Sequence, residues 1–360
     1  MKVKVIALFI AIKAVALLTL ALAANFQGHD LKRIFFRWDA QWYRHIAESG
    51  YGRLVTAGDG RELADYAFFP LYPLLERLIH NVTSLSYIYS GILISAVASI
   101  VAAVGIYRVV EISISSKVAT YTVILWAALP IAIVQTLAYS ESLFTALAAW
   151  AIYFAIRRNW WIAPIFAIAA GLTRPTGIAV VLAVMGAAIL ELRKRRRNKV
   201  AIFALLASPL GLLGYLYWVG TQLSGWNSYF EVTRGWGNSI DGGKAFAQWI
   251  KKFFDEGQPI LGLVLLLVVG ALFALLWNLW RKSLPQPILI YTSVLVLLSL
   301  MTSGYFGSKP RYLLPAFPLL IPLAVVLSKE VASRRRLIVF LAVITSAAYG
   351  AIWLTGSGPL

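Results

Sequence analysis

The sequence predicts an all-α integral membrane protein with about 11 transmembrane helices and two structured outer loops. Of its residues, 60% are hydrophobic and only 13% are charged, whereas soluble domains have about 45–50% apolar and about 25% charged residues. The apolar residues also form long blocks, such as 5–24, 261–280 and 337–354. Each block approaches or reaches the roughly 20 residues that a helix needs to cross the hydrocarbon core of a bilayer.

The first apolar block has two interpretations. Lys2 and Lys4 accompany it, as basic residues precede the apolar core of a secretory signal peptide. The block is too long for a signal peptide and lacks a convincing small-residue cleavage site, so we expect a retained first span. The chain shows no internal repeat and no linker, which indicates one membrane domain, 1–360. We place its spans at 5–24, 87–107, 119–138, 142–156, 160–173, 176–190, 200–219, 259–280, 285–303, 312–328 and 337–354.

The net charge of +18 follows the arrangement of these spans. With the N-terminus inside, the inner segments contain 18 basic and three acidic residues, whereas the outer segments are nearly balanced. This positive-inside pattern predicts an outer C-terminus and no nucleic-acid partner. The basic run 191–199 could be a nuclear-localisation or RNA patch, but its place between two spans favours an anchor at anionic lipid headgroups. The absence of cysteine excludes disulfides and thiolate metal sites.

Two outer segments, 25–86 and 220–258, are too long to be simple connections, and such loops are usually functional or structured. In the first, residues 40–48 have helical character. In the second, aromatic residues recur at helical spacing between lysines around residues 246–253, a pattern typical of a helix in the membrane interface. We expect the two segments to form a cap over an active site, although an interfacial aromatic belt is an equally good interpretation of any single Trp or Tyr.

Asp39 is the first candidate for chemistry. The motif Arg37–Tyr43 follows the first span, so its acid and base lie near the membrane among aromatic residues. Charged groups at that depth are costly unless they are paired or used, and Asp39 is therefore a candidate general base or orienting carboxylate. The alternative is that Asp39 caps the helix that begins near Ala40. The next motif, Phe68–Pro73, contains two prolines and favours a stiff structural corner.

Two further tight outer turns each contain one charge. Glu141, in the turn 138–142, is the only charged residue between Lys117 and Arg157. Arg174, in the turn 171–177, opposes the positive-inside bias and therefore requires an anionic partner, for which a phosphate or Glu141 would serve.

A third corner, Lys309–Tyr312, places two cations at the outer end of a span. Fixed cations at this depth suit a lipid phosphate, and a structural pair with Asp39 is the competing view. No metal cluster is evident; Asp39, Asp30 and Glu141 could hold a divalent ion only if the fold brings them together. Polar groups that converge on one face fit an enzyme at the outer leaflet better than a channel or a proton-coupled transporter.

The motifs resemble one known family. RWDAQWYRHIAESGY at 37–51 and FFPLYP at 68–73 resemble the signature of the PIG-V type mannosyltransferases, which add the second mannose in GPI-anchor assembly, and their prokaryotic relatives. AYSESLF at 138–144, GLTRPTG at 171–177 and RYLLPAFP at 311–318 follow in the order of that family. The resemblance covers essentially the whole chain, and its tryptophan-aspartate block is the most specific part.

This resemblance implies a glycosyltransferase of the GT-C fold, in a prokaryotic cytoplasmic membrane with its active site facing outward, or at the lumenal face of the endoplasmic reticulum in a eukaryote. The donor would be a polyprenyl- or dolichyl-phosphate mannose, the acceptor a glycolipid or glycan, and the reaction inverting, without an obligatory metal or other cofactor. Asp39 would be the catalytic residue. The substrate-binding candidates are Arg37, Trp38, Trp42, Glu141, Arg174, Lys309, Arg311 and Tyr312.

Two other interpretations stay open. A transporter or flippase of a lipid-linked sugar would share the basic corner but would not need Asp39 as a base. A structural subunit of a larger glycosyltransferase complex would show no turnover on its own. The block Gln41–Tyr43 differs from the histidine-phenylalanine of the eukaryotic members, so the sequence leaves the acceptor unassigned.

Overall fold

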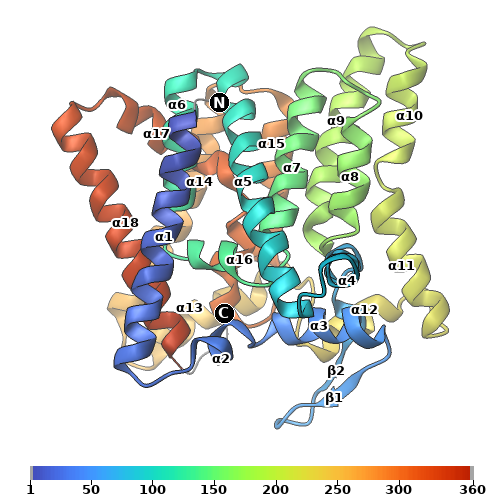
Figure 1. Cartoon of the computed structure of the whole chain (residues 1–360). Helices are drawn as coiled ribbons and strands as arrows, with labels where there is room; N and C mark the ends of the chain where they lie inside the picture. The colour runs from blue at the N-terminus through green and yellow to red at the C-terminus, as the bar shows by residue number, and fades with distance from the viewer. Residues whose placement is uncertain (1–2, 357–360) are drawn as a thin grey trace.

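Long apolar helices run side by side between two ends of the molecule (Figure 1). The structure, a computed structural model, describes residues 3–356. Within that range six helical segments are long and apolar enough to cross a membrane: α1 (Val3–Phe26), α5 (Tyr87–Ser113), Pro175–Lys194 with η3 (Pro175–Gly177) and α9 (Ile178–Lys194), Lys199–Gln222 with α10 (Lys199–Ala207) and α11 (Leu210–Gln222), α14 (Pro259–Arg281) and α18 (Ala332–Thr355). A 24-residue helix is about 36 Å long, enough for a hydrocarbon core of about 30 Å. The protein is therefore a multi-pass integral membrane protein.

The other five predicted spans coincide with helices that are short or broken. They correspond to α6 (Ser116–Ala127) with η2 (Ala132–Thr136), α7 (Glu141–Ile156), α8 (Ala163–Gly171), α15 (Gln286–Met301), and the chain of η4 (Phe306–Ser308), α16 (Lys309–Leu313), η5 (Phe317–Leu320) and α17 (Ile321–Lys329). The last group bends by 76° between Leu313 and Phe317. Helix α8, with nine residues, is only about 14 Å long. The helices confirm where the apolar segments lie, and the count of 11 crossings stays a prediction.

Small residues bring the central helices together. Helices α5 and α7 form one of the most extensive contacts of the bundle, and half of the buried residues of α7 are alanines. A Cβ on Gly105 of α5 would lie 2.9 Å from the Cβ of Ala149 on α7, so any larger side chain at Gly105 would force the pair apart. Close packing of small residues is the usual basis of helix association in a bilayer.

Side chains from neighbouring helices satisfy the carbonyls that the break after α6 leaves free. A broken helix in hydrocarbon is stable only when such groups find partners. Lys13 of α1 donates to the carbonyls of Ala127 (3.2 Å) and Ala132 (3.0 Å). Gln135 of η2 donates to the carbonyl of Trp126 (3.1 Å), and Ser346 of α18 donates to the carbonyl of Leu129 (2.6 Å). Lys13, the only charge within the first predicted span, therefore has a structural role at this break.

The two long segments lie together at one end of the bundle, which we call the loop end (Figure 1). The first contains α2 (Leu31–Phe35), α3 (Asp39–Ser49), β1 (Leu54–Thr56), β2 (Glu62–Ala64), η1 (Asp65–Ala67) and α4 (Leu71–Thr83), and the second contains α12 (Ser228–Gly235) and α13 (Lys244–Asp255). β1 and β2 form an antiparallel hairpin with Leu54 opposite Ala64. Helix α12 packs against β2 and η1, and α3 and α13 confirm the predicted helices.

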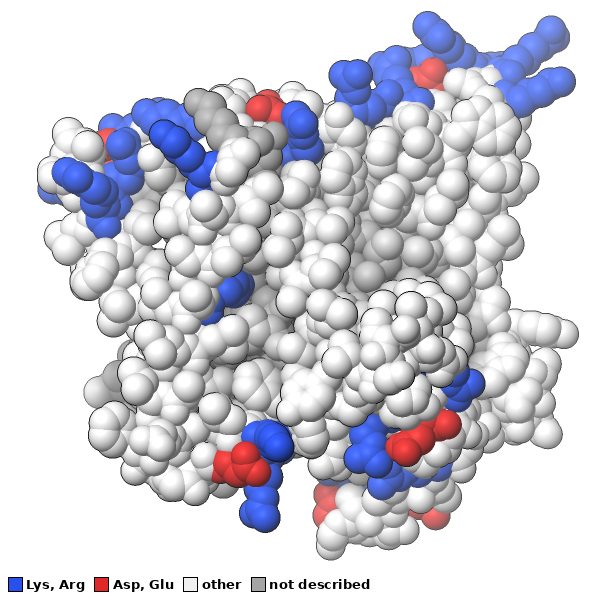
Figure 2. Space-filling model, in the orientation of Figure 1, with Lys and Arg blue, Asp and Glu red and all other residues white. Residues whose placement is uncertain are grey.

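Charges distribute unequally between the two ends. Figure 2 shows lysines and arginines gathered at the end opposite the loop end, whereas acidic and basic groups mix at the loop end. Arg195, Arg196 and Arg197 are exposed between α9 and α10 and belong to the basic end. The distribution agrees with a positive-inside orientation, which places the basic end in the cytoplasm as a prediction.

The absence of native cysteine allows this orientation to be tested by labelling. We expect a membrane-impermeant maleimide to label Gly58→Cys, in the exposed hairpin turn, on intact cells. Arg196→Cys, exposed at the basic end, should be labelled only after permeabilisation. The unmodified protein is the control without label, and the opposite pattern for the two variants would reverse the orientation.

Candidate functional site

The site begins at a strained residue before α3. Trp38 has φ 54° and ψ −124°, a conformation that non-glycine residues rarely adopt and that costs about 1–3 kcal/mol. Asp39 follows as the first residue of α3. Its carboxylate does not cap the helix but contacts the guanidinium of Arg311 on α16. The capping interpretation of Asp39 is therefore wrong, and the strained turn directs the carboxylate toward the membrane helices.

Four charged side chains form one ion network at this point. Besides contacting Asp39, Arg311 places its Nε 2.6 Å from Oε1 of Glu141. The same Glu141 oxygen lies 2.7 Å from an Nη atom of Arg174. The side chain of Glu141 is fully buried, and that of Asp39 is 21% exposed. Buried charges are tolerated only when paired, and two carboxylates and two guanidiniums give the network no net charge.

A chain of hydroxyls connects this network to α3. The hydroxyl of Tyr43 lies 2.7 Å from Oγ of Ser140, and that Oγ also accepts a hydrogen bond of 3.0 Å from Arg174. Burial raises the pKa of Tyr43, so the phenol stays protonated. Burial alone would lower the pKa of Arg174, but Glu141, Tyr43 and Asp39 together outweigh burial and raise that pKa, so the guanidinium stays charged.

The network lies where several short helices end. Glu141 is the first residue of α7, after the broken segment of η2, and Arg174 lies between α8 and η3. The turn at Arg174 requires glycine, because a Cβ on Gly177 would lie 2.6 Å from the carbonyl oxygen of Ala170. Non-helical backbone is stable within a membrane protein only where protein buries it or a cavity adjoins it. The breaks are thus what gathers polar groups from distant parts of the chain.

The predicted site residues divide into two groups. Asp39, Glu141, Arg174 and Arg311 come together, and Tyr312 lies beside them. The other four, Arg37, Trp38, Trp42 and Lys309, have different partners. Lys309 donates to the carbonyls of Ser299 (2.8 Å) and Thr302 at the end of α15. Arg37 donates to the carbonyl of Gly356 (3.3 Å) and lies over the ring of Trp38 (5.7 Å), and Trp42 packs on Phe68 (5.6 Å) and Trp236 (5.0 Å). Lys309 and Arg37 therefore fix helix ends in this structure.

A divalent-ion site from Asp39, Asp30 and Glu141 does not form. Asp30 caps α2 by accepting a hydrogen bond of 2.9 Å from the backbone N–H of Lys32, apart from the ion network. Across residues 3–356, no three histidine or acidic side chains are close enough to hold a metal ion together.

Helix α4 connects the first loop segment to the backbone of the site. The hydroxyl of Tyr72 donates to the carbonyl of Gly91 on α5 (2.8 Å), and Ser95, one turn further, donates to the carbonyl of Tyr139 (3.0 Å). Glu76 on the same face of α4 is fully buried, and neither of its carboxyl oxygens has a hydrogen-bond partner in the described part of the chain. Burial raises the pKa of Glu76 well above its ordinary value.

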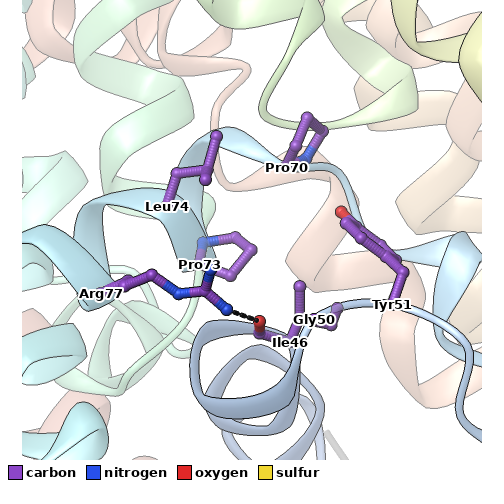
Figure 3. A pocket seen from close by; sticks show the side chains of 7 residues that line it. All are labelled: Ile46, Gly50, Tyr51, Pro70, Pro73, Leu74 and Arg77. Atoms are coloured by element: carbon purple, nitrogen blue, oxygen red, sulfur yellow. Dashed lines mark hydrogen bonds between the residues drawn. The ribbon is translucent and has the colours of Figure 1, made fainter.

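Helix α3 is also held at its C-terminus. Arg77 of α4 donates to the carbonyls of Ala47 (2.6 Å) and Ile46 (3.2 Å), so α4 fixes the helix that begins with Asp39. A cavity of about 90 Å³ lies at this junction (Figure 3), lined by Ile46, Gly50, Tyr51, Pro70, Pro73, Leu74 and Arg77. The cavity is separate from the ion network and contains no titratable carboxyl group among its lining residues.

Similarity to known proteins supports the fold. The sequence model of dolichyl-phosphate-mannose-protein mannosyltransferases matches residues 69–218. ArnT from Cupriavidus metallidurans bound to undecaprenyl phosphate superposes with a TM-score of 0.53 at 13% identity, covering 96% of this chain and 74% of ArnT. The fold is that of the GT-C glycosyltransferases. ArnT in its apo state gives a TM-score of 0.52 at 14% identity over 85% of this chain and 57% of ArnT. No curated protein sequence matches significantly.

These matches bear on the sequence-based expectation only in part. The GT-C fold is confirmed, whereas the resemblance to the PIG-V type stays a prediction because the matching sequence model describes a different mannosyltransferase family. Tyr139 and Ser140 belong to the motif at 138–144, but nothing in the sequence assigned either of them a role. Tyr43 belonged to the tryptophan-aspartate motif, but nothing in the sequence showed that it reaches Ser140.

Removing one partner of the buried network should lower the free energy of unfolding far more than removing one partner of an exposed ion pair. Arg174→Gln removes one of the two guanidiniums that neutralise the buried carboxylate of Glu141. Breaking a buried ion pair destabilises a protein by about 3–5 kcal/mol. Arg44→Gln is the control, because Arg44 and Glu48 form an exposed pair on α3 at 3.1 Å, worth about 0–1 kcal/mol. Thermal unfolding followed by tryptophan fluorescence should show a large loss for Arg174→Gln alone. Equal shifts would contradict a buried network.

Glu76 should make stability depend on pH. The pKa of Glu76 is raised in the folded protein, so its contribution is full below its unfolded pKa of about 4.3 and is lost as pH rises toward the folded value. Over that window the loss is about 1.4 kcal/mol per pH unit. Glu76→Gln should therefore lose less thermal stability than the wild type between pH 5 and pH 8. Parallel profiles would show that Glu76 is not held protonated.

Proposed function

We propose that the protein is a membrane glycosyltransferase that transfers mannose from a polyprenyl-phosphate donor to a glycolipid or glycan acceptor on the outer face, with inversion at the anomeric carbon. The observation that carries this proposal is the buried network of Asp39, Arg311, Glu141 and Arg174. It offers a partly exposed carboxylate beside fixed guanidiniums at a membrane boundary, which is the combination that a lipid-phosphate sugar requires.

The nature of the donor is supported by the similar proteins. One similar ArnT structure is bound to undecaprenyl phosphate, and the matching sequence model is that of dolichyl-phosphate-mannose-protein mannosyltransferases. Mannose is also the sugar that the resemblance to the PIG-V type implies. Neither the similar proteins nor the resemblance indicates the acceptor, so we define the acceptor only by the hydroxyl group that attacks the anomeric carbon.

The proposed reaction starts with an exchange of anions. The donor phosphate takes the place of Asp39 on Arg311, which frees the carboxylate to face the acceptor. The acceptor hydroxyl attacks the anomeric carbon from the side opposite the phosphate, a new C–O bond forms, and the bond to the phosphate oxygen breaks. Asp39 receives the hydroxyl proton, and Arg311 stabilises the charge that develops on the departing lipid phosphate.

The remaining candidates have supporting roles in this proposal. Glu141 keeps both guanidiniums in place, since it contacts Arg174 and Arg311 with the same oxygen. Trp42 lies one turn after Asp39 on α3, where Phe68 stacks on its ring and Arg53 lies 5.2 Å from the ring centre, so a sugar contacts Trp42 only where these neighbours leave the ring exposed. Trp38 and Tyr312 border the network, while Lys309 and Arg37 act on substrate only if they leave their present carbonyl partners.

Replacement of the proposed base tests the function directly. We expect the purified protein to transfer sugar from polyprenyl-phosphate mannose to a mixed lipid-acceptor pool, and Asp39→Asn to transfer about 10²–10⁴-fold more slowly. Asp30→Asn is the matched control, because Asn caps a helix as well as Asp and Asp30 only caps α2. Transfer is measured with radiolabelled donor, and thermal unfolding verifies that both variants fold.

The outcomes distinguish the alternatives. Equal transfer by Asp39→Asn and wild type would remove Asp39 as the base and leave Glu141 as the next candidate. If the wild type transfers nothing but moves lipid-linked sugar across vesicles, and Asp39→Asn does so equally well, the protein is a flippase. Turnover that appears only after a second subunit is added would identify a structural component of a complex.

A further inference from the structure

Tyr139 has a buried hydroxyl that the network does not use. Its side chain is 1% exposed, and within the described residues the proton of its hydroxyl has no acceptor. A buried hydroxyl without an acceptor costs about 1–3 kcal/mol, and such groups are rare enough to require an explanation. Other buried tyrosines of this protein do have acceptors, as Tyr72 and Tyr215 illustrate.

The surroundings of this hydroxyl are those of an anion site. The guanidinium of Arg311 lies 4.9 Å from the centre of the Tyr139 ring, and the backbone N–H of Asp39 is within hydrogen-bonding reach of the hydroxyl. That N–H belongs to the first turn of α3, an 11-residue helix, where amides have no partner within the helix and the helix dipole is positive. Asp39 therefore lies between the hydroxyl, the helix terminus and Arg311.

The geometry points to Tyr139 as a further donor to the lipid phosphate. This inference rests on the proposed function. When the phosphate replaces the Asp39 carboxylate on Arg311, the Tyr139 O–H donates to one of its oxygens and the α3 terminus supplies a backbone donor beside it. A phosphate oxygen gains negative charge as its bond to the sugar breaks, so this hydrogen bond strengthens during the reaction. Arg311 packs on the ring of Tyr139, and Ser95 donates a hydrogen bond to the carbonyl of Tyr139. These two contacts keep the hydroxyl in place.

Tyr139→Phe removes only the hydroxyl and tests the inference by binding. We expect the purified full chain to bind undecaprenyl phosphate about tenfold more weakly after this change, as for the loss of a hydrogen bond to a charged group. Thermal stability should change little, because the only hydrogen bond lost is the one that the Asp39 backbone N–H donates to the hydroxyl. Tyr215→Phe is the control: it removes a buried hydroxyl that donates to Phe68 (2.8 Å), so it should lower stability and leave binding unchanged.

Further measurements separate the possible partners. Inorganic phosphate, measured in the same way, should also bind more weakly to Tyr139→Phe if the hydroxyl contacts the phosphate, whereas a lipid-specific loss would place the contact elsewhere and overturn the inference. In the transfer assay, KM for the donor should rise and KM for the acceptor should not. Unchanged affinity for undecaprenyl phosphate would reject the role of Tyr139 and leave the proposed function intact, whereas a wild type that binds no polyprenyl phosphate would reject both.

Discussion

The contact of Glu141 with two arginines is the interaction on which the site depends. One buried carboxylate oxygen lies 2.7 Å from Arg174 and 2.6 Å from Arg311, and Arg311 extends the network to Asp39. These residues come from the loop end, from the start of α7, from the turn after α8 and from α16, so the network joins four separate parts of the chain. In a region of low dielectric an incomplete set of charges would be strongly destabilising, and this requirement fixes the relative positions of all four.

Broken helices make this arrangement possible. Continuous helices would place their polar ends only at the membrane surfaces, whereas the ends of α6, α8 and α16 lie against buried side chains. The freed carbonyls then need donors, which distant helices supply, for example Trp126 to Leu314 (3.0 Å) and Tyr291 to Pro315 (2.9 Å). Such donors are the reason that aromatic residues with polar atoms occur deep in the bundle.

Sequence predicted the parts of this site that depend on isolated charges. Glu141 and Arg174 stood alone in apolar surroundings, and their pairing was one of two named alternatives. The positions of the helices were also predictable from hydrophobic blocks. The conformation of Trp38 was not, because a positive φ at a tryptophan has no sequence signal, and it decides where Asp39 points. Nor could the sequence show that Lys309 reaches the carbonyls at the end of α15, since this depends on where that helix stops.

Lys13 has a consequence for the order in which the chain is assembled. Its ammonium group lies in the first membrane helix, but the carbonyls that accept its hydrogen bonds, those of Ala127 and Ala132, follow 114 and 119 residues later. During synthesis α1 therefore enters the bilayer before these acceptors exist, and a lysine at the centre of an inserted helix costs about 2.5–3.5 kcal/mol. Until α6 and η2 are inserted, only the burial of the apolar residues of α1 in lipid offsets this free energy. The position of α1 in the bundle therefore becomes fixed only when Lys13 meets its acceptors.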